Sequence, residues 1–218
     1  MKVLELFKGT GSVGKIIEEL YPDAEIYSVD ILKKYNPTYC GDIMTWNYKQ
    51  FPEGYFNMIW ASPECKVFSK LQHTWLKTGK RKEKGKWDSV EHLNRVRQDH
   101  GQFSAKAVEI INYFKPKSWF VENPYHSAMK DLPHMKELPS YRFDYCRYGF
   151  PYKKPTRIWT NLKFDDVICN CKERHKQRVG IGNGSEFIYN TELGDSKGIS
   201  QRYQIPFKLL RHLFKNLK

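Results

Sequence analysis

The hydrophobic residues in the first half of the chain follow two different periods. Short apolar runs at residues 3–7, Glu25–Asp30, 56–61 and 119–122 predict buried strands. Between the first two runs, Ser12–Leu20 repeats its apolar residues at the spacing of one helical face. Strands that alternate with helices in this way predict an α/β fold with a mostly parallel sheet.

Two more helices and two irregular segments follow from the same patterning. Residues 103–114 carry apolar side chains at helical spacing, and residues 206–217 form an amphipathic helix. Residues 70–97 are polar, basic and rich in glycine and lysine, which predicts a mobile surface loop. Residues 169–200 lack a clear period and predict loops or a small β insertion.

Length and hydropathy narrow the class of protein. A chain of 218 residues fits one domain with a small appendage. No apolar run approaches the roughly 18 to 20 residues that a membrane helix needs, and the N-terminus lacks the features of a signal peptide. We therefore expect an intracellular protein, cytoplasmic or nuclear, whose five cysteines do not form a disulfide framework.

The net charge of +13 adds a candidate partner. Residues 77–86, KTGKRKEKGK, hold six Lys or Arg and one Glu. A basic cluster of this kind favours a polyanion, nucleic acid first, over a merely solubilising surface.

A glycine-rich turn joins the first strand to the first helix. Residues 7–14, FKGTGSVG, contain G-x-G-x-x-G, which lets the backbone approach a ligand at the helix N-terminus. Asp30 ends the next strand, where its carboxylate can accept ribose hydroxyls. The pattern alone fits NAD, S-adenosylmethionine or a turn without ligand. Asp42 in the C-G-D-I segment and the stretch SPEC after residue 61 are not expected of a dehydrogenase.

Cys65 is the sharpest candidate for chemistry. It lies in SPECKVFS, residues 62–69, directly after a predicted strand that Pro63 ends. A lone cysteine is most often a buried inert thiol. At the end of a buried strand it can also be a nucleophile.

Several motifs together resemble those of the C5-cytosine DNA methyltransferases. Residues 65–69, CKVFS, resemble the P-C-Q-x-F-S element, and residues 120–124, FVENP, resemble E-N-V. Residues 148–157, YGFPYKKPTR, are similar to Y-G-x-P-Q-x-R-x-R, and residues 4–9, LELFKG, to D-L-F-x-G. Residues 201–206, QRYQIP, are a looser match to the last motif, which folds back beside the first. The combination resembles small phage or viral members most.

This resemblance implies a Rossmann-like class I methyltransferase that transfers a methyl group from S-adenosylmethionine to cytosine C5 in DNA. The Cys65 thiolate would add to C6 of the base. Glu122 would stabilise N3, and Arg157, with Lys154 as a second candidate, would lie near O2. Lys66 and the basic cluster are candidate cations for lowering the pKa of the thiol.

The resemblance also implies the other contacts and the domain plan. Residues 1–161 would form the catalytic domain, residues 162–200 a short recognition insertion, and residues 201–218 a helix packing back. A region this short predicts short or relaxed sequence specificity. The cofactor-binding residues would be Phe7, Gly9, Thr10, Gly11, Ser12, Asp30, Ile31, Asp42, Ile43 and Ser62. The nucleic-acid contacts would be Ser69, Lys77, Lys80, Arg81, Lys82, Lys84 and Lys86, with Trp75 or Trp87 as a wedge in the base stack.

Departures from the family motifs keep other functions open. Glu64 stands where the family has proline, and its charge beside the thiol would raise the pKa of Cys65. Tyr152 replaces a glutamine. A catalytically silent nucleic-acid-binding protein, an RNA methyltransferase and an N4-cytosine methyltransferase are the alternatives.

A second group of cysteines hints at a metal. Cys169-x-Cys171-x3-His175, with Cys146 as a distant ligand, has a C-x-C spacing unlike the usual C-x2-C knuckle. The spacing favours cysteines in a loop without a metal.

Overall fold

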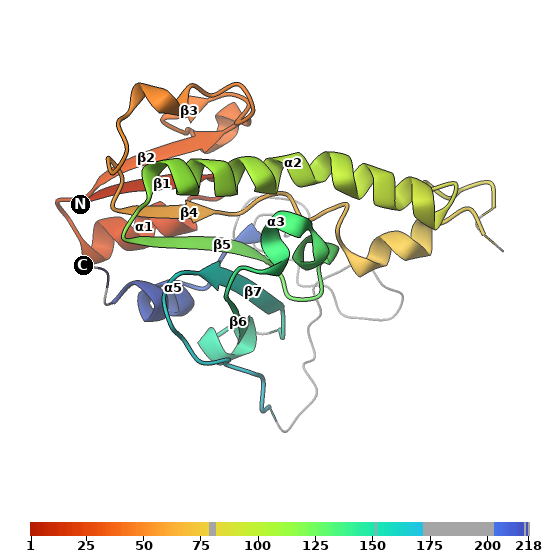
Figure 1. The fold of residues 1–218 in the computed structure, drawn as a ribbon. Helices are drawn as coiled ribbons and strands as arrows, with labels where there is room; N and C mark the ends of the chain where they lie inside the picture. Colours follow the sequence, from red (N-terminus) through yellow and green to blue (C-terminus); the bar gives the residue numbers. More distant parts are fainter. Residues whose placement is uncertain (79–81, 151, 172–202, 216, 218) are drawn as a thin grey trace.

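The computed structural model describes residues 1–78, 82–150, 152–171, 203–215 and 217. Its centre is a seven-stranded sheet with the order β3-β2-β1-β4-β5-β7-β6 (Figure 1). The strands are β1 (Lys2–Leu6), β2 (Glu25–Asp30), β3 (Tyr39–Cys40), β4 (Met58–Ala61), β5 (Ser118–Pro124), β6 (Ser140–Asp144) and β7 (Pro155–Thr160).

Strand β7 runs in the direction opposite to the other six strands of the sheet. The pairs β1–β2, β1–β4, β2–β3 and β4–β5 are parallel. Strand β7 runs antiparallel to both β5 and β6. The predicted mostly parallel α/β sheet is therefore confirmed, with an antiparallel hairpin of β6 and β7 at one edge.

Helices cover both faces of the sheet. One face packs against α2 (Val90–Phe114) and the other against α1 (Ser12–Leu20) and α5 (Phe207–Phe214) (Figure 1). A short helix, α3 (Pro133–Lys136), follows β5. The 3₁₀ helices are η1 (Lys33–Tyr35), η2 (Tyr48–Gln50), η3 (Lys70–Trp75), η5 (Ala128–Asp131) and η6 (Tyr145–Tyr148).

The chain ends beside its own first helix. The Arg211 guanidinium of α5 donates to both carboxylate oxygens of Glu19 in α1, at 2.8 and 2.7 Å. The backbone N–H of Ile205 reaches the Ser12 hydroxyl at 3.4 Å, so the approach to α5 lies against the glycine-rich turn.

Two elements differ from the sequence-based expectations. Residues 70–97 are not one irregular loop, because η3 and the first two turns of α2 lie within them. Ser89 begins α2 early: its hydroxyl accepts the His92 N–H at 3.1 Å, which satisfies a helix-end donor. The hairpin of β6 and β7 was not predicted either.

Within the described residues, no helix combines the length and the apolar character needed to cross a lipid bilayer.

Candidate active site

The predicted site residues follow the carboxyl ends of neighbouring parallel strands. The glycine-rich turn follows β1, residues 62–69 follow β4, and Glu122 lies near the end of β5. In open α/β sheets, ligands bind outside the carboxyl ends of the strands, at the point where the strand order reverses. In this sheet the order reverses between β1 and β4.

The turn after β1 has the backbone of a ligand-binding loop. Gly9 and Gly11 have φ of 51° and 68°, and half-buried Phe7 has φ of 59°, all in the left-handed region. The Asp30 carboxylate holds the turn, because its Oδ2 accepts the Gly9 N–H at 2.9 Å. Its Oδ1 accepts the Leu32 N–H at 2.8 Å.

Asp30 can still bind a ribose. Each carboxylate oxygen has more than one lone pair, so two backbone bonds leave room for hydroxyl donors. Ile31 beside it is 66% exposed, which offers an apolar surface for a purine. These features fit an adenosine-containing cofactor.

The remaining predicted cofactor residues differ in their burial and in the contacts of their side chains. The Asp42 carboxylate accepts the Met44 N–H at 2.9 Å and caps a turn. Ile43 is buried, so only its backbone could meet a ligand. The Ser62 hydroxyl accepts the Trp60 indole N–H at 2.8 Å, and the Thr10 and Ser12 hydroxyls lie 3.0 Å apart.

Glu5 is a buried acid under this turn that the sequence patterns did not single out. It is 2% exposed, and a Cβ at Gly14 would lie 3.4 Å from its Oε2. Burial raises the pKa of Glu5 to about 8, although Lys8 and the N–H groups at the start of α1 lower it. Glu5 is therefore protonated in the folded protein at neutral pH.

This raised pKa predicts a pH-dependent stability. Between the ordinary value of 4.5 and about 8, the folded chain binds a proton that the unfolded chain releases. Stability therefore falls as pH rises through this window, by about 5 kcal/mol in total, and is then constant. We expect Glu5→Gln to remove this loss in urea unfolding between about pH 5 and about pH 8.5. Glu18→Gln, at an exposed position of α1, is the control, and its stability should depend on pH as that of the wild type does.

The loop that carries Cys65 is fixed by backbone contacts. The Asn123 amide of β5 donates to the Pro63 carbonyl at 3.0 Å in a buried position. The Phe68 N–H bonds the Cys65 carbonyl at 3.1 Å, and the Phe68 carbonyl accepts the Ala128 N–H at 2.9 Å. Asn123 thus explains why the E-N dipeptide accompanies the cysteine loop.

The structure places Cys65 near Glu122 and Lys154. The pKa of the Cys65 thiol is raised, first by burial and then by the Glu122 charge, while Lys154 lowers it. Glu64 raises it slightly, in the direction that the sequence predicts. Lys154 is the cation that lowers this pKa most, and Lys66, the sequence-based candidate, is exposed.

Glu122 is a partly accessible acid in a largely apolar setting. Burial raises its pKa, and Lys154 and the Tyr145 hydroxyl, 3.4 Å from Oε1, lower it. The Lys154 ammonium lies over the Tyr145 ring, 4.7 Å from its centre. Glu122, Lys154 and Tyr145 therefore form one group around the thiol.

Arg157 is placed apart from this group. It pairs with Asn123 across β5 and β7, whereas Glu122 pairs with Ile158, so Arg157 and Glu122 lie on opposite faces of the sheet. Its guanidinium donates to the Ser140 hydroxyl at 2.7 Å and stacks over the Tyr125 ring at 4.4 Å. The structure brings Lys154, not Arg157, beside the thiol and the acid.

Arg97 is a further residue that sequence patterns missed. It is 9% exposed on α2, and its Nε–H donates to the Val67 carbonyl at 3.0 Å. Its Nη2 reaches the Ser69 carbonyl at 3.4 Å. Arg97 therefore ties the Cys65 loop to the long helix.

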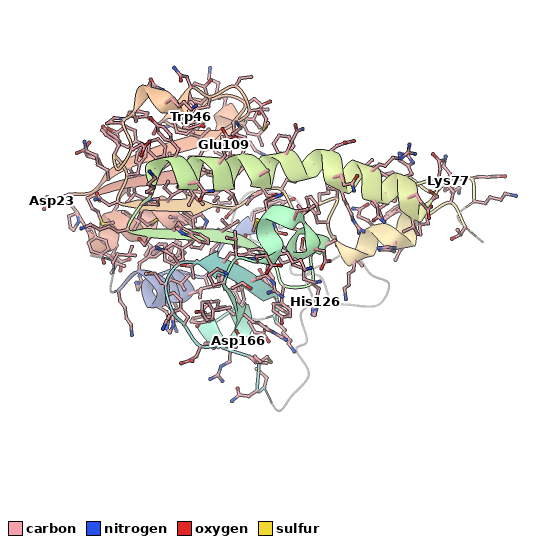
Figure 2. The ribbon with its side chains drawn as sticks, in the orientation of Figure 1. Asp23, Trp46, Lys77, Glu109, His126 and Asp166 are labelled. Carbon is pink, nitrogen blue, oxygen red and sulfur yellow. The ribbon has the colours of Figure 1, made fainter. Side chains whose placement is uncertain are left out.

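Apart from Ser69, the predicted nucleic-acid contacts that the structure describes lie on an arm that extends beyond the sheet with the N-terminal part of α2 (Figures 1 and 2). We call the described residues from Lys70 to Asp88 the basic arm. Lys77 is paired with Asp88 at 2.6 Å, and the Lys86 ammonium lies 4.4 Å from the Trp87 ring centre. Lys80 and Arg81 lie outside the described residues, and Lys82 and Lys84 are exposed.

Two aromatic residues of the basic arm differ in exposure. Trp87 is 4% exposed and its indole N–H donates to Gln72 at 2.9 Å, so it belongs to the folded arm. Trp75 is 45% exposed. The Ser69 hydroxyl accepts the Leu71 N–H at 3.2 Å and caps η3.

The fold and these residues define a class I methyltransferase with a cysteine loop after the fourth strand. No family model matches the sequence. The chain is 34% identical over 215 residues to "Probable DNA (cytosine-5)-methyltransferase" of Frog virus 3 (isolate Goorha), a match that covers 94% of this chain and 95% of the relative. The protein belongs to the DNA (cytosine-5)-methyltransferase family.

Two solved structures are similar to this chain at low sequence identity. A DNA modification methyltransferase encoded within an E. coli prophage is 12% identical, with a TM-score of 0.49 over 73% of this chain and 46% of that chain. The Entamoeba histolytica methyltransferase EhMeth is 16% identical, with a TM-score of 0.49 over 80% and 57%. The chain thus spans about half the length of these structures.

Proposed function

We propose that this protein methylates C5 of cytosine in DNA through a covalent adduct at Cys65. The observation that carries the proposal is the grouping of Cys65, Glu122 and Lys154 at the carboxyl ends of the parallel strands, where Glu122 raises the pKa of the thiol and Lys154 lowers the pKa of both Cys65 and Glu122. S-adenosylmethionine supplies the methyl group. The glycine-rich turn, Asp30 and Ile31 would hold it beside the cysteine loop.

The chemistry requires a nucleophile because C5 of cytosine is itself weakly nucleophilic. The Cys65 thiolate adds to C6, and the electron pair of the C5–C6 double bond becomes available at C5 to accept the methyl group. A base then removes the C5 proton, the electrons restore the double bond, and the thiolate leaves. The thiol is regenerated unchanged after the cycle.

Glu122 and Lys154 would each stabilise a negative charge that the reaction requires. Addition at C6 places negative charge on the ring, which a protonated Glu122 can stabilise by donating to N3. Its raised pKa favours that protonated form. Lys154 lowers the pKa of the Cys65 thiol and so favours the thiolate. We assign the role near O2 to Lys154, because Arg157 lies on the other face.

DNA is the proposed partner of the basic arm. Its exposed lysines suit phosphate contacts, which position a duplex without reading its sequence. Trp75, exposed on the arm, is the better of the two tryptophans to enter a base stack. The predicted recognition region falls mostly on residues 172–202, which lie outside the described residues, so short or relaxed specificity stays part of this proposal.

Nucleoside mass spectrometry tests the function directly. The protein and S-adenosylmethionine would be incubated with duplex DNA and, separately, with a structured RNA. We expect 5-methylcytosine in the DNA. N4-methylcytosine would indicate an N4-cytosine methyltransferase instead, and methylation confined to RNA would indicate an RNA methyltransferase. Intact DNA binding with no modified base would indicate a catalytically silent nucleic-acid-binding protein.

The position of Arg97 predicts a loss of activity without loss of cofactor binding. Arg97→Lys removes the guanidinium that holds two loop carbonyls, and we expect kcat to fall about tenfold and stability by about 2 kcal/mol. The dissociation constant for S-adenosylmethionine should not change. Arg95→Lys, exposed on the same helix, is the matched control. Equal kcat in the two variants would contradict a positioning role for Arg97.

A further inference from the structure

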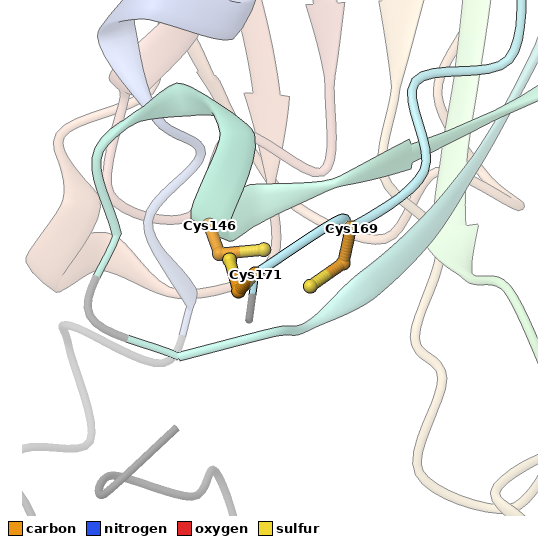
Figure 3. A group of neighbouring side chains, drawn as sticks. All are labelled: Cys146, Cys169 and Cys171. Atoms are coloured by element: carbon orange, nitrogen blue, oxygen red, sulfur yellow. The ribbon is translucent and has the colours of Figure 1, made fainter. Parts of the chain in front are cut away.

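Three cysteines that are distant in sequence converge at one edge of the sheet, away from the proposed active-site thiol. Cys146 comes from η6, and Cys169 and Cys171 from the segment that follows β7 (Figure 3). The three sulfur atoms all lie within 4.8 Å of one another. The C-x-C spacing of Cys169 and Cys171 favours cysteines in a loop without a metal. The fold brings the thiol of Cys146 beside these two. His175, the ligand suggested by sequence, lies outside the described residues.

The segment that carries Cys169 and Cys171 is fastened to β6 by backbone contacts. The Val167 N–H donates to the Arg142 carbonyl at 2.7 Å, and the Asp144 N–H donates to the Val167 carbonyl at 2.9 Å. The Asp166 carboxylate accepts the Arg142 N–H at 2.7 Å. These bonds fix the segment beside the point where β6 leads into η6.

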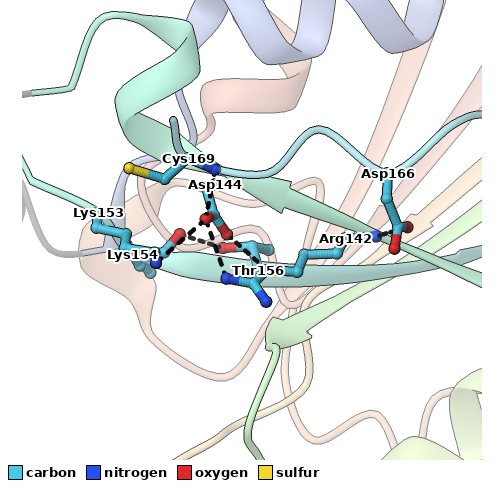
Figure 4. A network of polar contacts seen from close by, with 7 residues as sticks. All are labelled: Arg142, Asp144, Lys153, Lys154, Thr156, Asp166 and Cys169. Atoms are coloured by element: carbon cyan, nitrogen blue, oxygen red, sulfur yellow. Dashed lines mark hydrogen bonds and ion pairs between the residues drawn. The ribbon is translucent and has the colours of Figure 1, made fainter. Parts of the chain in front are cut away.

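Asp144 of β6 binds the cysteine segment from a buried position. It is fully buried, and its Oδ2 accepts the Cys169 N–H at 2.9 Å (Figure 4). The Arg142 guanidinium binds both of its carboxylate oxygens at 2.8 and 3.0 Å, and the Lys153 ammonium lies 3.8 Å away. Next to Cys169, the Asn170 side chain accepts a hydrogen bond from Arg147, a neighbour of Cys146 in η6. The backbone of Cys169 and the side chain of Asn170 are thus held beside β6 and η6.

A thiophilic metal fits this arrangement better than three thiols do. The three sulfur atoms lie within 4.8 Å of one another, a spacing that allows one cation to contact all three. A divalent cation would bind them as thiolates. Tetrahedral zinc with bonds of about 2.3 Å places sulfur atoms about 3.8 Å apart, so only a small contraction is needed.

We propose that Cys146, Cys169 and Cys171 form a structural zinc site. Binding releases the three thiol protons, gives the metal and its ligands a net charge of −1, and leaves the fourth tetrahedral position for water or another side chain. Soft thiolate donors select zinc over magnesium or calcium. No redox step is involved.

The site would stabilise η6, and through it one part of the proposed active site. Tyr145 precedes Cys146 in η6, is fully buried, and donates to Glu122 at 3.4 Å. A metal that fixes η6 therefore also fixes the partner of Glu122. This consequence rests on the proposed function, whereas the metal site itself does not.

Metal content tests the site independently of activity. The full chain, prepared without a metal-affinity column or chelator, would be compared with Cys146→Ser, Cys169→Ser and Cys171→Ser by elemental mass spectrometry. We expect about one zinc per chain in wild type and a loss of more than about tenfold in zinc affinity in each variant. Cys40→Ser, an exposed cysteine elsewhere, is the control and should retain the metal.

Cobalt substitution keeps the test valid if a serine variant does not fold. Wild-type protein loaded with Co²⁺ should give the intense visible bands of a tetrahedral thiolate site and lose them when zinc is added. Absence of zinc and of these bands after loading would overturn the proposal. So would metal retained in all three serine variants, or a disulfide between any two of these cysteines under reducing conditions. If zinc binds but DNA is not methylated, the site stands and the proposed function fails.

Discussion

Cys65→Ala should abolish methyl transfer to DNA, lowering kcat by at least about 10³-fold. In the proposed mechanism the thiol forms the bond to C6 that makes C5 reactive, and no other described cysteine lies in the loop after β4. The alanine side chain removes a half-buried sulfur without disturbing the backbone bonds through Pro63 and Phe68 that hold this loop. Affinity for S-adenosylmethionine and for duplex DNA should therefore stay close to wild type.

Cys40→Ala provides the matched control for this variant. Cys40 is exposed on β3 and should tolerate replacement with unchanged kcat. Rates would be measured by transfer of a labelled methyl group to DNA, with calorimetry for cofactor binding. Persistent transfer by Cys65→Ala would remove the thiolate from the mechanism and favour methylation of the exocyclic amine.

Glu122→Gln should lower kcat by about 10² to 10⁴-fold, because glutamine cannot transfer a proton to N3. The same change should make Cys65 more acidic. The Glu122 charge is the second largest cause of the raised pKa of the thiol, after burial, and glutamine removes it. Iodoacetamide should then alkylate Cys65 at lower pH than in wild type. Lys154→Met should shift the alkylation profile in the opposite direction, since Lys154 lowers this pKa.

The coupled pair also predicts the shape of the pH profile. The productive state has one proton on the pair, with a thiolate on Cys65 and a neutral Glu122. Below the lower apparent pKa both groups are protonated, and above the higher one both are ionised, so kcat/KM should be bell-shaped. In Glu122→Gln the falling limb at high pH should disappear. Glu137→Gln, at an exposed position, is the control and should keep both limbs. A falling limb that persists in Glu122→Gln would assign it to another group.

Local sequence patterns predicted four of the five parallel strands, and the short strand β3 was not predicted. Ser12–Leu20 and Glu25–Asp30 have the bounds that their apolar periods predict, because each buries one face or both against neighbouring elements. The hairpin of β6 and β7 was harder to recognise. Strand β7 begins within residues 148–157, a motif that was interpreted as chemistry, although its TRIWT pattern carries a strand signal.

The surroundings of Arg157, Glu5 and Cys146 could not be predicted from sequence, because they depend on contacts between distant segments. The faces of β7 depend on its register with β5, and that register separates Arg157 from Glu122 while Lys154 lies beside the thiol. Glu5 looks like an ordinary strand residue until α1 covers it. Cys146 meets Cys169 and Cys171 only because residues after β7 return along β6.

The most direct test of the central claim is covalent trapping of the protein on DNA that contains 5-fluorocytosine. Fluorine at C5 cannot leave as a proton does, so a thiolate adduct that has accepted a methyl group cannot be resolved. With S-adenosylmethionine present, we predict a stable protein–DNA complex whose peptide map places the nucleotide on Cys65. Methylation of ordinary cytosine in DNA, without any adduct on Cys65 in the fluorinated duplex, would contradict the account.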